Sequence, residues 1–98
     1  MIDHKHIGTV FPKVSTLIEK GRLKFFAKAT GQTDPIYFDE DAALAAGYPA
    51  LPVPPTYLFC AEMTDVPEPV GWLAGIGVNL LHILHGEQRF DYRAMAFA

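Results

Sequence analysis

Three titratable side chains are candidates for proton transfer, namely Asp34, Tyr37 and His85. A carboxylate can accept a proton from water, and a phenol or an imidazole can deliver one, which is general acid–base chemistry. Asp34 directly precedes Pro35, however, and an aspartate in such a turn usually hydrogen-bonds nearby backbone. His85 precedes Gly86 at the start of a predicted strand, where a structural hydrogen bond is the simpler interpretation. Catalysis by Asp34, with Tyr37 or His85 as the acid, stays as an alternative.

Metal and thiol chemistry have weaker signals. His82 and His85 are three residues apart, but no cysteine, aspartate or third histidine follows at a suitable spacing, so we predict no metal site. The single cysteine, Cys60, lies inside an apolar run. This setting predicts a buried, inert thiol, excludes a disulfide framework and indicates a reducing compartment.

Length and charge limit the classes of partner. The 98 residues fit one domain, residues 1–98, and the formal net charge is -3. No basic stripe is present, so nucleic-acid binding is not expected. The longest apolar stretch, 70–84, is too short and too rich in glycine to cross a bilayer, and the charged N-terminus is no signal peptide. We therefore predict a cytoplasmic protein with no membrane partner.

Helices must position the loop that carries Asp34. The first helix is expected to end before Gly31, which can act as a left-handed cap, and Thr16 and Glu19 have capping-box spacing near its start. A second, short helix follows Asp39 as its N-cap and stops at Gly47.

The second half of the chain carries three further signals. Four prolines between residues 48 and 55 rule out a central strand and predict a stiff, extended approach. Residues 56–63 are apolar nearly all round, with Glu62 as the only charge, which predicts a helix buried in the middle of the domain. Residues 84–92 alternate toward their end, and this pattern predicts a strand.

Four segments occur in a fixed order: F-A-K-A-T-G-Q-T-D-P-I-Y-F-D at 26–39, A-A-G-Y-P at 45–49, V-P-P-T at 53–56 and L-H-G-E-Q-R-F at 84–90. Together they resemble the N-terminal domain of MaoC-like dehydratases, also called FAS1-like dehydratase domains. The resemblance implies an α+β hot-dog fold, in which an antiparallel sheet wraps a central helix, here residues 56–63. It also implies acyl-CoA or acyl-carrier-protein thioesters as ligands, with no other cofactor. The implied reaction is reversible hydration of a trans-2-enoyl thioester to the (R)-3-hydroxyacyl product.

That reaction needs a base for water, a proton for the α-carbon and N–H groups that polarise the thioester carbonyl. Active relatives carry an aspartate and a histidine in a loop reading G-D-x-N-P-x-H. Here Gln32 takes the aspartate place, Asp34 the asparagine place and Tyr37 the histidine place. An amide does not titrate near neutral pH, and a phenol has an ordinary pKa of about 10.

Active relatives also begin the central helix with His-Gly, where this chain has Pro55 and Thr56, so one potential N–H donor is lost. These departures predict the non-catalytic half of a double hot-dog, which shapes the acyl tunnel while a partner carries the dyad. Core filling is the default for Tyr57 and Phe59, and tunnel lining is their functional interpretation. The predicted substrate contacts are Pro55, Thr56, Tyr57, Phe59, His85 and Gly86.

The C-terminus departs from the family pattern. Further strands normally follow F-D-Y, but this sequence reads R-A-M-A-F-A to Ala98, so the hot-dog sheet is expected to be incomplete. A truncated gene, a fragment, and completion by another subunit all fit. Without those strands the central helix would expose apolar surface and favour association with a catalytic hot-dog chain or a second copy. A degenerate fragment that serves only for packing is the third functional alternative.

Overall fold

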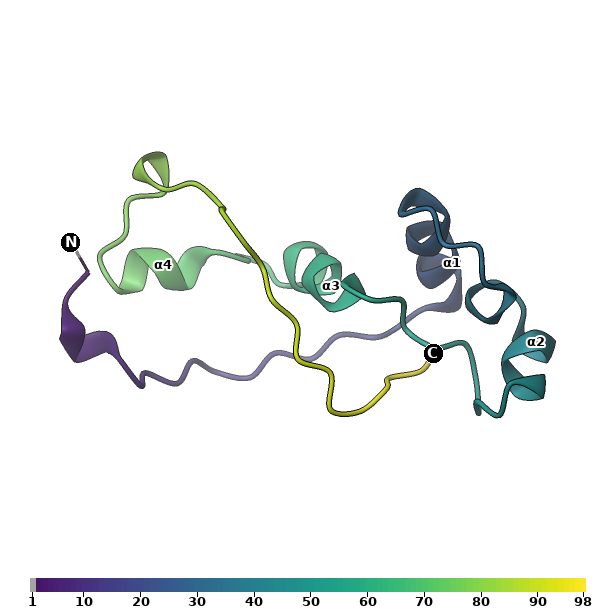
Figure 1. The fold of residues 1–98 in the computed structure, drawn as a ribbon. Helices are drawn as coiled ribbons and strands as arrows, with labels where there is room; N and C mark the ends of the chain where they lie inside the picture. Colours follow the sequence, from purple (N-terminus) through teal and green to yellow (C-terminus); the bar gives the residue numbers. More distant parts are fainter. Residues whose placement is uncertain (1) are drawn as a thin grey trace. The chain divides into compact units, whose positions relative to one another are not determined.

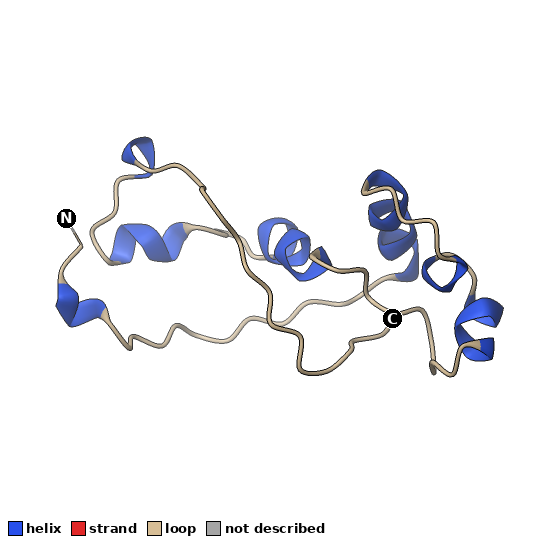
Figure 2. Ribbon diagram, viewed as in Figure 1, coloured by secondary structure: helices blue, strands red, loops and turns tan. Residues whose placement is uncertain are grey.

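The computed structural model describes residues 2–98, which are mainly helices joined by extended loops (Figures 1 and 2). The chain divides into two compact units. The first comprises residues 17–60 and 90–98, and the second comprises residues 61–89 and the chain up to residue 16. The elements are η1 (His4–His6), α1 (Lys20–Ala29), η2 (Pro35–Tyr37), α2 (Glu40–Ala45), α3 (Tyr57–Asp65), α4 (Gly71–Gly75) and η3 (Leu80–His82).

Helix α1 packs one face inward and ends as predicted. Leu23 and Ala27, four residues apart, are both fully buried. Gly31 has φ +78°, which a glycine adopts at no steric cost. The Gln32 N–H donates to the Ala27 carbonyl at 2.9 Å and the Gly31 N–H to the Lys28 carbonyl at 3.2 Å. This pair of bonds is a Schellman motif, so the predicted glycine cap is confirmed.

The predicted capping box at the start of α1 is wrong. The helix begins only at Lys20, with Glu19 as an N-cap whose side chain makes no capping hydrogen bond. Thr16 therefore lies too early in the chain to cap the first turn. Its hydroxyl donates to the Asp65 carboxylate instead.

Helix α2 confirms both of its predicted ends. The Asp39 carboxylate accepts the Asp41 N–H at 2.9 Å, which satisfies one of the free donors of the first turn. Gly47 has φ +93°, and the Tyr48 N–H donates to the Ala43 carbonyl at 3.0 Å, repeating the Schellman motif of α1.

The proline-rich approach is extended, as predicted, and pairs with the end of the chain. The Val53 N–H donates to the Ala96 carbonyl at 2.9 Å, and the Ala98 N–H donates to the Leu51 carbonyl at 3.0 Å. Pro52 and Phe97 form an antiparallel bridge between them. Figure 1 shows the C-terminus beside this approach. Pro52 and Phe97 form the non-hydrogen-bonded pair between these two bonds, so the missing N–H of Pro52 does not interrupt the pairing.

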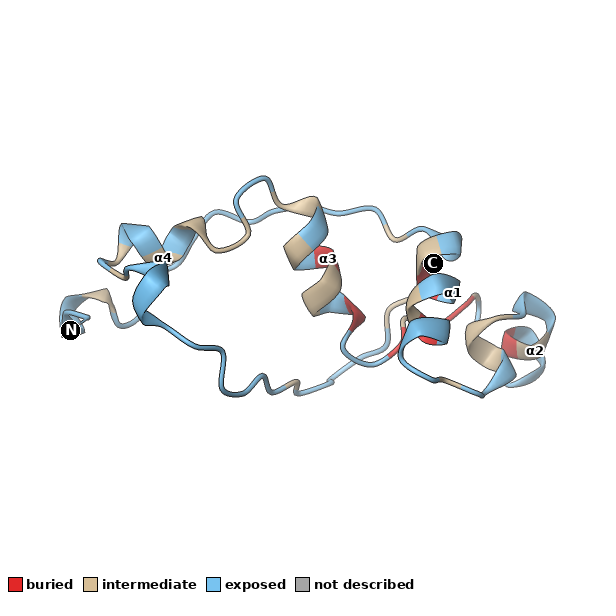
Figure 3. Cartoon of the chain, turned by 90° about the horizontal axis from the view of Figure 1, so that it is seen from above, coloured by how far each residue is buried: buried red, intermediate tan, exposed pale blue. Residues whose placement is uncertain are grey.

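Helix α3 confirms a helix over the apolar run, but the predicted burial on all sides is wrong. Tyr57 and Ala61 are its buried residues, whereas Leu58 is 46% exposed (Figure 3). The physical reason is that residues 2–98 form no sheet around the helix, since the Pro52–Phe97 bridge is their only strand-like pairing. The hot-dog architecture stays a prediction.

The predicted strand over residues 84–92 is also wrong, because this segment is extended without a paired neighbour. Strand hydrogen bonds need a second strand, which an alternating pattern alone does not supply. The alternation still indicates side-chain direction correctly, since the rings of Phe90 and Tyr92 stack at 5.9 Å with an interplanar angle of 8°. Across residues 2–98, every helix is too short or too polar to traverse a bilayer.

Candidate functional site

The loop before η2 is built as a turn. The Asp34 side chain accepts the Ile36 N–H at 3.1 Å, and the Asp34 carbonyl accepts the Tyr37 N–H at 3.2 Å. Pro35 occupies the first position of η2, where its missing N–H costs nothing. Asp34 is exposed and caps this turn, as the turn-forming interpretation predicts.

Tyr37 occupies the histidine place of the dyad and is half-buried. Burial, first, and then the charge of Asp34 and the neighbouring Tyr48 phenol raise the pKa of Tyr37 above its ordinary value. The phenol therefore keeps its proton throughout the neutral range. Tyr37 can donate a hydrogen bond there but cannot act as a base.

An apolar cavity of about 160 Å³ opens beside Tyr37 within the first unit. Two phenols, those of Tyr37 and Tyr92, lie in its lining. The remaining walls come from the proline-rich approach, the first turn of α3 and the C-terminal segment; they are Val53, Pro55, Leu58, Ala94, Met95 and Ala96. The cavity is thus a mainly apolar space with two tyrosines in its lining.

Thr56, at the start of α3, adopts φ +69°. This left-handed backbone is costly for a β-branched residue and natural for glycine. Active relatives are expected from the resemblance to carry a glycine at this place, and glycine adopts such a backbone without steric cost. The Thr56 N–H donates to the Tyr92 hydroxyl at 2.7 Å.

The other predicted substrate contacts are not among the lining residues of this cavity. Tyr57 is buried in the core, edge-on to Phe26 with ring centroids 5.3 Å apart. Phe59 is half-buried, and neither ring lines the cavity. His85 and Gly86 are exposed and belong to the second compact unit. Of the predicted contacts, Pro55 lines the cavity, and the Thr56 N–H donates a hydrogen bond to Tyr92, which also lines it.

Sequence reasoning missed the C-terminal part of the site. Tyr92 and the segment 94–96 line the cavity, but the alternating pattern indicated only a strand. The one available signal in the sequence was the two-residue spacing of Phe90 and Tyr92, which places both rings on the same side of an extended segment.

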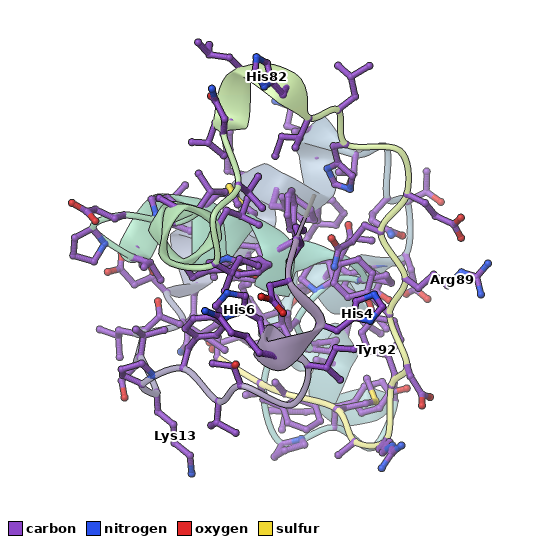
Figure 4. All side chains as sticks on the ribbon, turned by 90° about the vertical axis from the view of Figure 1, so that its left-hand side faces the viewer. His4, His6, Lys13, His82, Arg89 and Tyr92 are labelled. Carbon is purple, nitrogen blue, oxygen red and sulfur yellow. The ribbon has the colours of Figure 1, made fainter. Side chains whose placement is uncertain are left out.

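The second unit carries the histidines. Figure 4 shows His82 on η3 well apart from His4 and His6 on η1. Within residues 2–98, no three His, Cys, Asp or Glu side chains come together in a way that could hold a metal ion. Cys60 is half-buried rather than fully buried as predicted, and it forms no disulfide.

The family model for the FAS1-like, dehydratase domain region matches residues 5–98. The chain belongs to this family. The resemblance inferred from the four sequence segments is therefore confirmed, and the chain is a dehydratase-like domain.

Several curated proteins named UPF0336 protein are similar to this FAS1-like domain. That of Streptomyces griseus is 29% identical over 92 residues, which cover 93% of this chain and 61% of the relative. That of Mycobacterium tuberculosis is 32% identical over 76 residues, covering 78% of this chain and 45% of the relative. The chain thus spans about 61% of the length of the Streptomyces relative. No solved structure matches it.

Proposed function

We propose that this chain is the non-catalytic, acyl-thioester-binding half or subunit of an (R)-specific enoyl hydratase/3-hydroxyacyl dehydratase of the hot-dog type. The observation that carries the proposal is the chemistry at the two dyad places. Gln32 supplies an amide, which does not titrate, and Tyr37 supplies a phenol whose pKa is raised above its ordinary value. Neither group can activate water near neutral pH.

Binding is supported by a different set of groups. The cavity beside Tyr37 is mostly apolar, as an acyl chain requires, and two of its lining residues are tyrosines, whose hydroxyl groups are donors of the kind that suits a carbonyl oxygen. A partner is supported by the apolar side chains left in solvent, such as Leu58 at 46% exposure and Phe25 at 75%. The proposed partner is a hot-dog chain that carries an intact G-D-x-N-P-x-H loop.

The test compares the purified chain, the catalytic partner and their mixture. Hydration of crotonyl-CoA is followed by loss of the enoyl-thioester absorbance, and light scattering on the same samples reports association. We expect no turnover by the chain alone and faster turnover in the mixture than with the partner alone. Turnover by the chain alone, lost in Asp34→Asn or His85→Ala, would instead establish an independent dehydratase.

Ligand binding separates the proposal from the packing-fragment alternative. Calorimetric titration with crotonyl-CoA should show tighter binding than titration with free coenzyme A, because only the thioester carries an acyl chain for the cavity. Equal affinity for the two ligands, together with no effect on the partner's turnover, would refute the proposal.

A further inference from the structure

We propose that the cavity beside Tyr37 binds a short acyl chain of about six carbons or fewer, with the Tyr92 hydroxyl as the donor to the ligand's carbonyl oxygen and Met95 as the wall that limits chain length. This inference rests on the proposed acyl-thioester function, and it specifies the ligand size and two residues that the sequence did not indicate.

The Tyr92 hydroxyl is prepared for donation by its hydrogen bond. It accepts the Thr56 N–H at 2.7 Å, which leaves the proton of the hydroxyl itself to be donated to a second acceptor. A hydroxyl that already accepts a bond becomes a stronger donor, because consecutive hydrogen bonds polarise one another. The Thr56 N–H therefore acts on a ligand in the cavity indirectly, through the hydroxyl of Tyr92, a residue of the lining.

This arrangement replaces a donor that the sequence lacks. Pro55 has no N–H to offer at the start of α3, and the Thr56 N–H is already engaged by Tyr92. The only hydroxyl groups in the lining are those of Tyr92 and Tyr37. Tyr37 can serve as the second donor because its phenol stays protonated.

Cavity size limits the acyl chain. The volume is about 160 Å³, and a cavity of about 150 Å³ holds one benzene ring, so roughly six carbons fit. One wall is held by the hydrogen bonds that pair Val53 with Ala96 and Leu51 with Ala98. Met95, next to this pairing, has the longest flexible side chain in the lining, so shortening it should lengthen the cavity.

The experiment titrates butyryl-CoA, octanoyl-CoA and free coenzyme A into the full chain. We expect butyryl-CoA to bind more tightly than free coenzyme A, with no further gain for octanoyl-CoA. Tyr92→Phe should weaken butyryl-CoA binding about three- to tenfold, the usual worth of one neutral hydrogen bond. Tyr48→Phe is the control, because the Tyr48 ring contacts Phe97 and does not line the cavity, and because burial and Asp34, the larger causes of the raised pKa of Tyr37, stay in place in this variant.

A second pair of variants tests the size limit. Met95→Ala should tighten octanoyl-CoA binding relative to butyryl-CoA about tenfold, since roughly two more methylenes become buried. Met95→Leu, which conserves volume, should leave the ratio unchanged. If Tyr92→Phe lowers the unfolding temperature, the Met95 pair still tests the cavity.

The outcomes distinguish this inference from the function on which it rests. No difference between any acyl-CoA and free coenzyme A would overturn the proposed function. Acyl-CoA binding that is unchanged in both Tyr92→Phe and Met95→Ala would overturn only the assignment of the pocket.

Discussion

Thr56→Gly should stabilise the chain, because the wild-type residue holds a glycine-like backbone at φ +69°. The left-handed region costs an L-residue about 1–2 kcal/mol, and glycine removes that cost. Glycine also gives the unfolded chain more freedom, which opposes the gain by about 0.5–1 kcal/mol. Thr56 is exposed, so no packing is lost. The expected net gain in the free energy of unfolding is about 0.5–1 kcal/mol.

Thermal unfolding followed by circular dichroism measures this gain. For a domain of about 100 residues, 1 kcal/mol shifts Tm by roughly 4–8 °C, so we expect a rise of a few degrees. Thr56→Ala is the control, because its Cβ retains most of the left-handed cost and Tm should change little. A lower Tm for Thr56→Gly than for Thr56→Ala would show that the backbone at residue 56 carries no strain.

The remaining predictions concern the helix ends and one ion pair. Gly31→Ala, just after the end of α1, should lower the free energy of unfolding by about 1 kcal/mol. Gly21→Ala, inside α1, should raise it by about 0.5 kcal/mol. An added Cβ meets no atom within 4 Å at either glycine, and only Gly31 has positive φ, so equal shifts in Tm would contradict the backbone argument. The hydrogen bond and charge of Lys20 lower the pKa of Glu40. A lowered pKa contributes stability that is present above the ordinary glutamate pKa and is lost as the pH falls through the folded value. Unfolding temperatures measured against pH should therefore fall more steeply on acidification for wild type than for Glu40→Gln, and added salt should reduce the difference.

Local features of the fold were predictable from the sequence, and long-range pairing was not. Asp39, Gly31 and Gly47 act on backbone groups within five residues, so their types and spacing contain the needed information. The one extended pairing joins residues 51–53 to 96–98. Prolines made the first of these segments look unsuitable for pairing, and the second is too short to show an alternating pattern. Neither segment signals the other in the sequence.

In the candidate site, too, the residues in local sequence motifs were predictable and the residue brought in by a long-range contact was not. The resemblance indicated Tyr37 and Pro55 because they lie in segments that match the family, whereas Tyr92 enters through a hydrogen bond between residues 36 positions apart.

The contrast between the two family positions supports binding over catalysis. At the two places that the resemblance aligns with the dyad, Gln32 does not titrate and the phenol of Tyr37 keeps its proton near neutral pH. At the start of α3, Thr56 adopts a left-handed backbone despite its steric cost, and its N–H donates to the hydroxyl of Tyr92, a residue that lines an apolar cavity. Binding a thioester without reacting with it requires a hydrogen-bond donor for the carbonyl oxygen but no group that transfers protons. The Tyr92 hydroxyl, which already accepts the Thr56 N–H, still has its own proton to donate to such an oxygen.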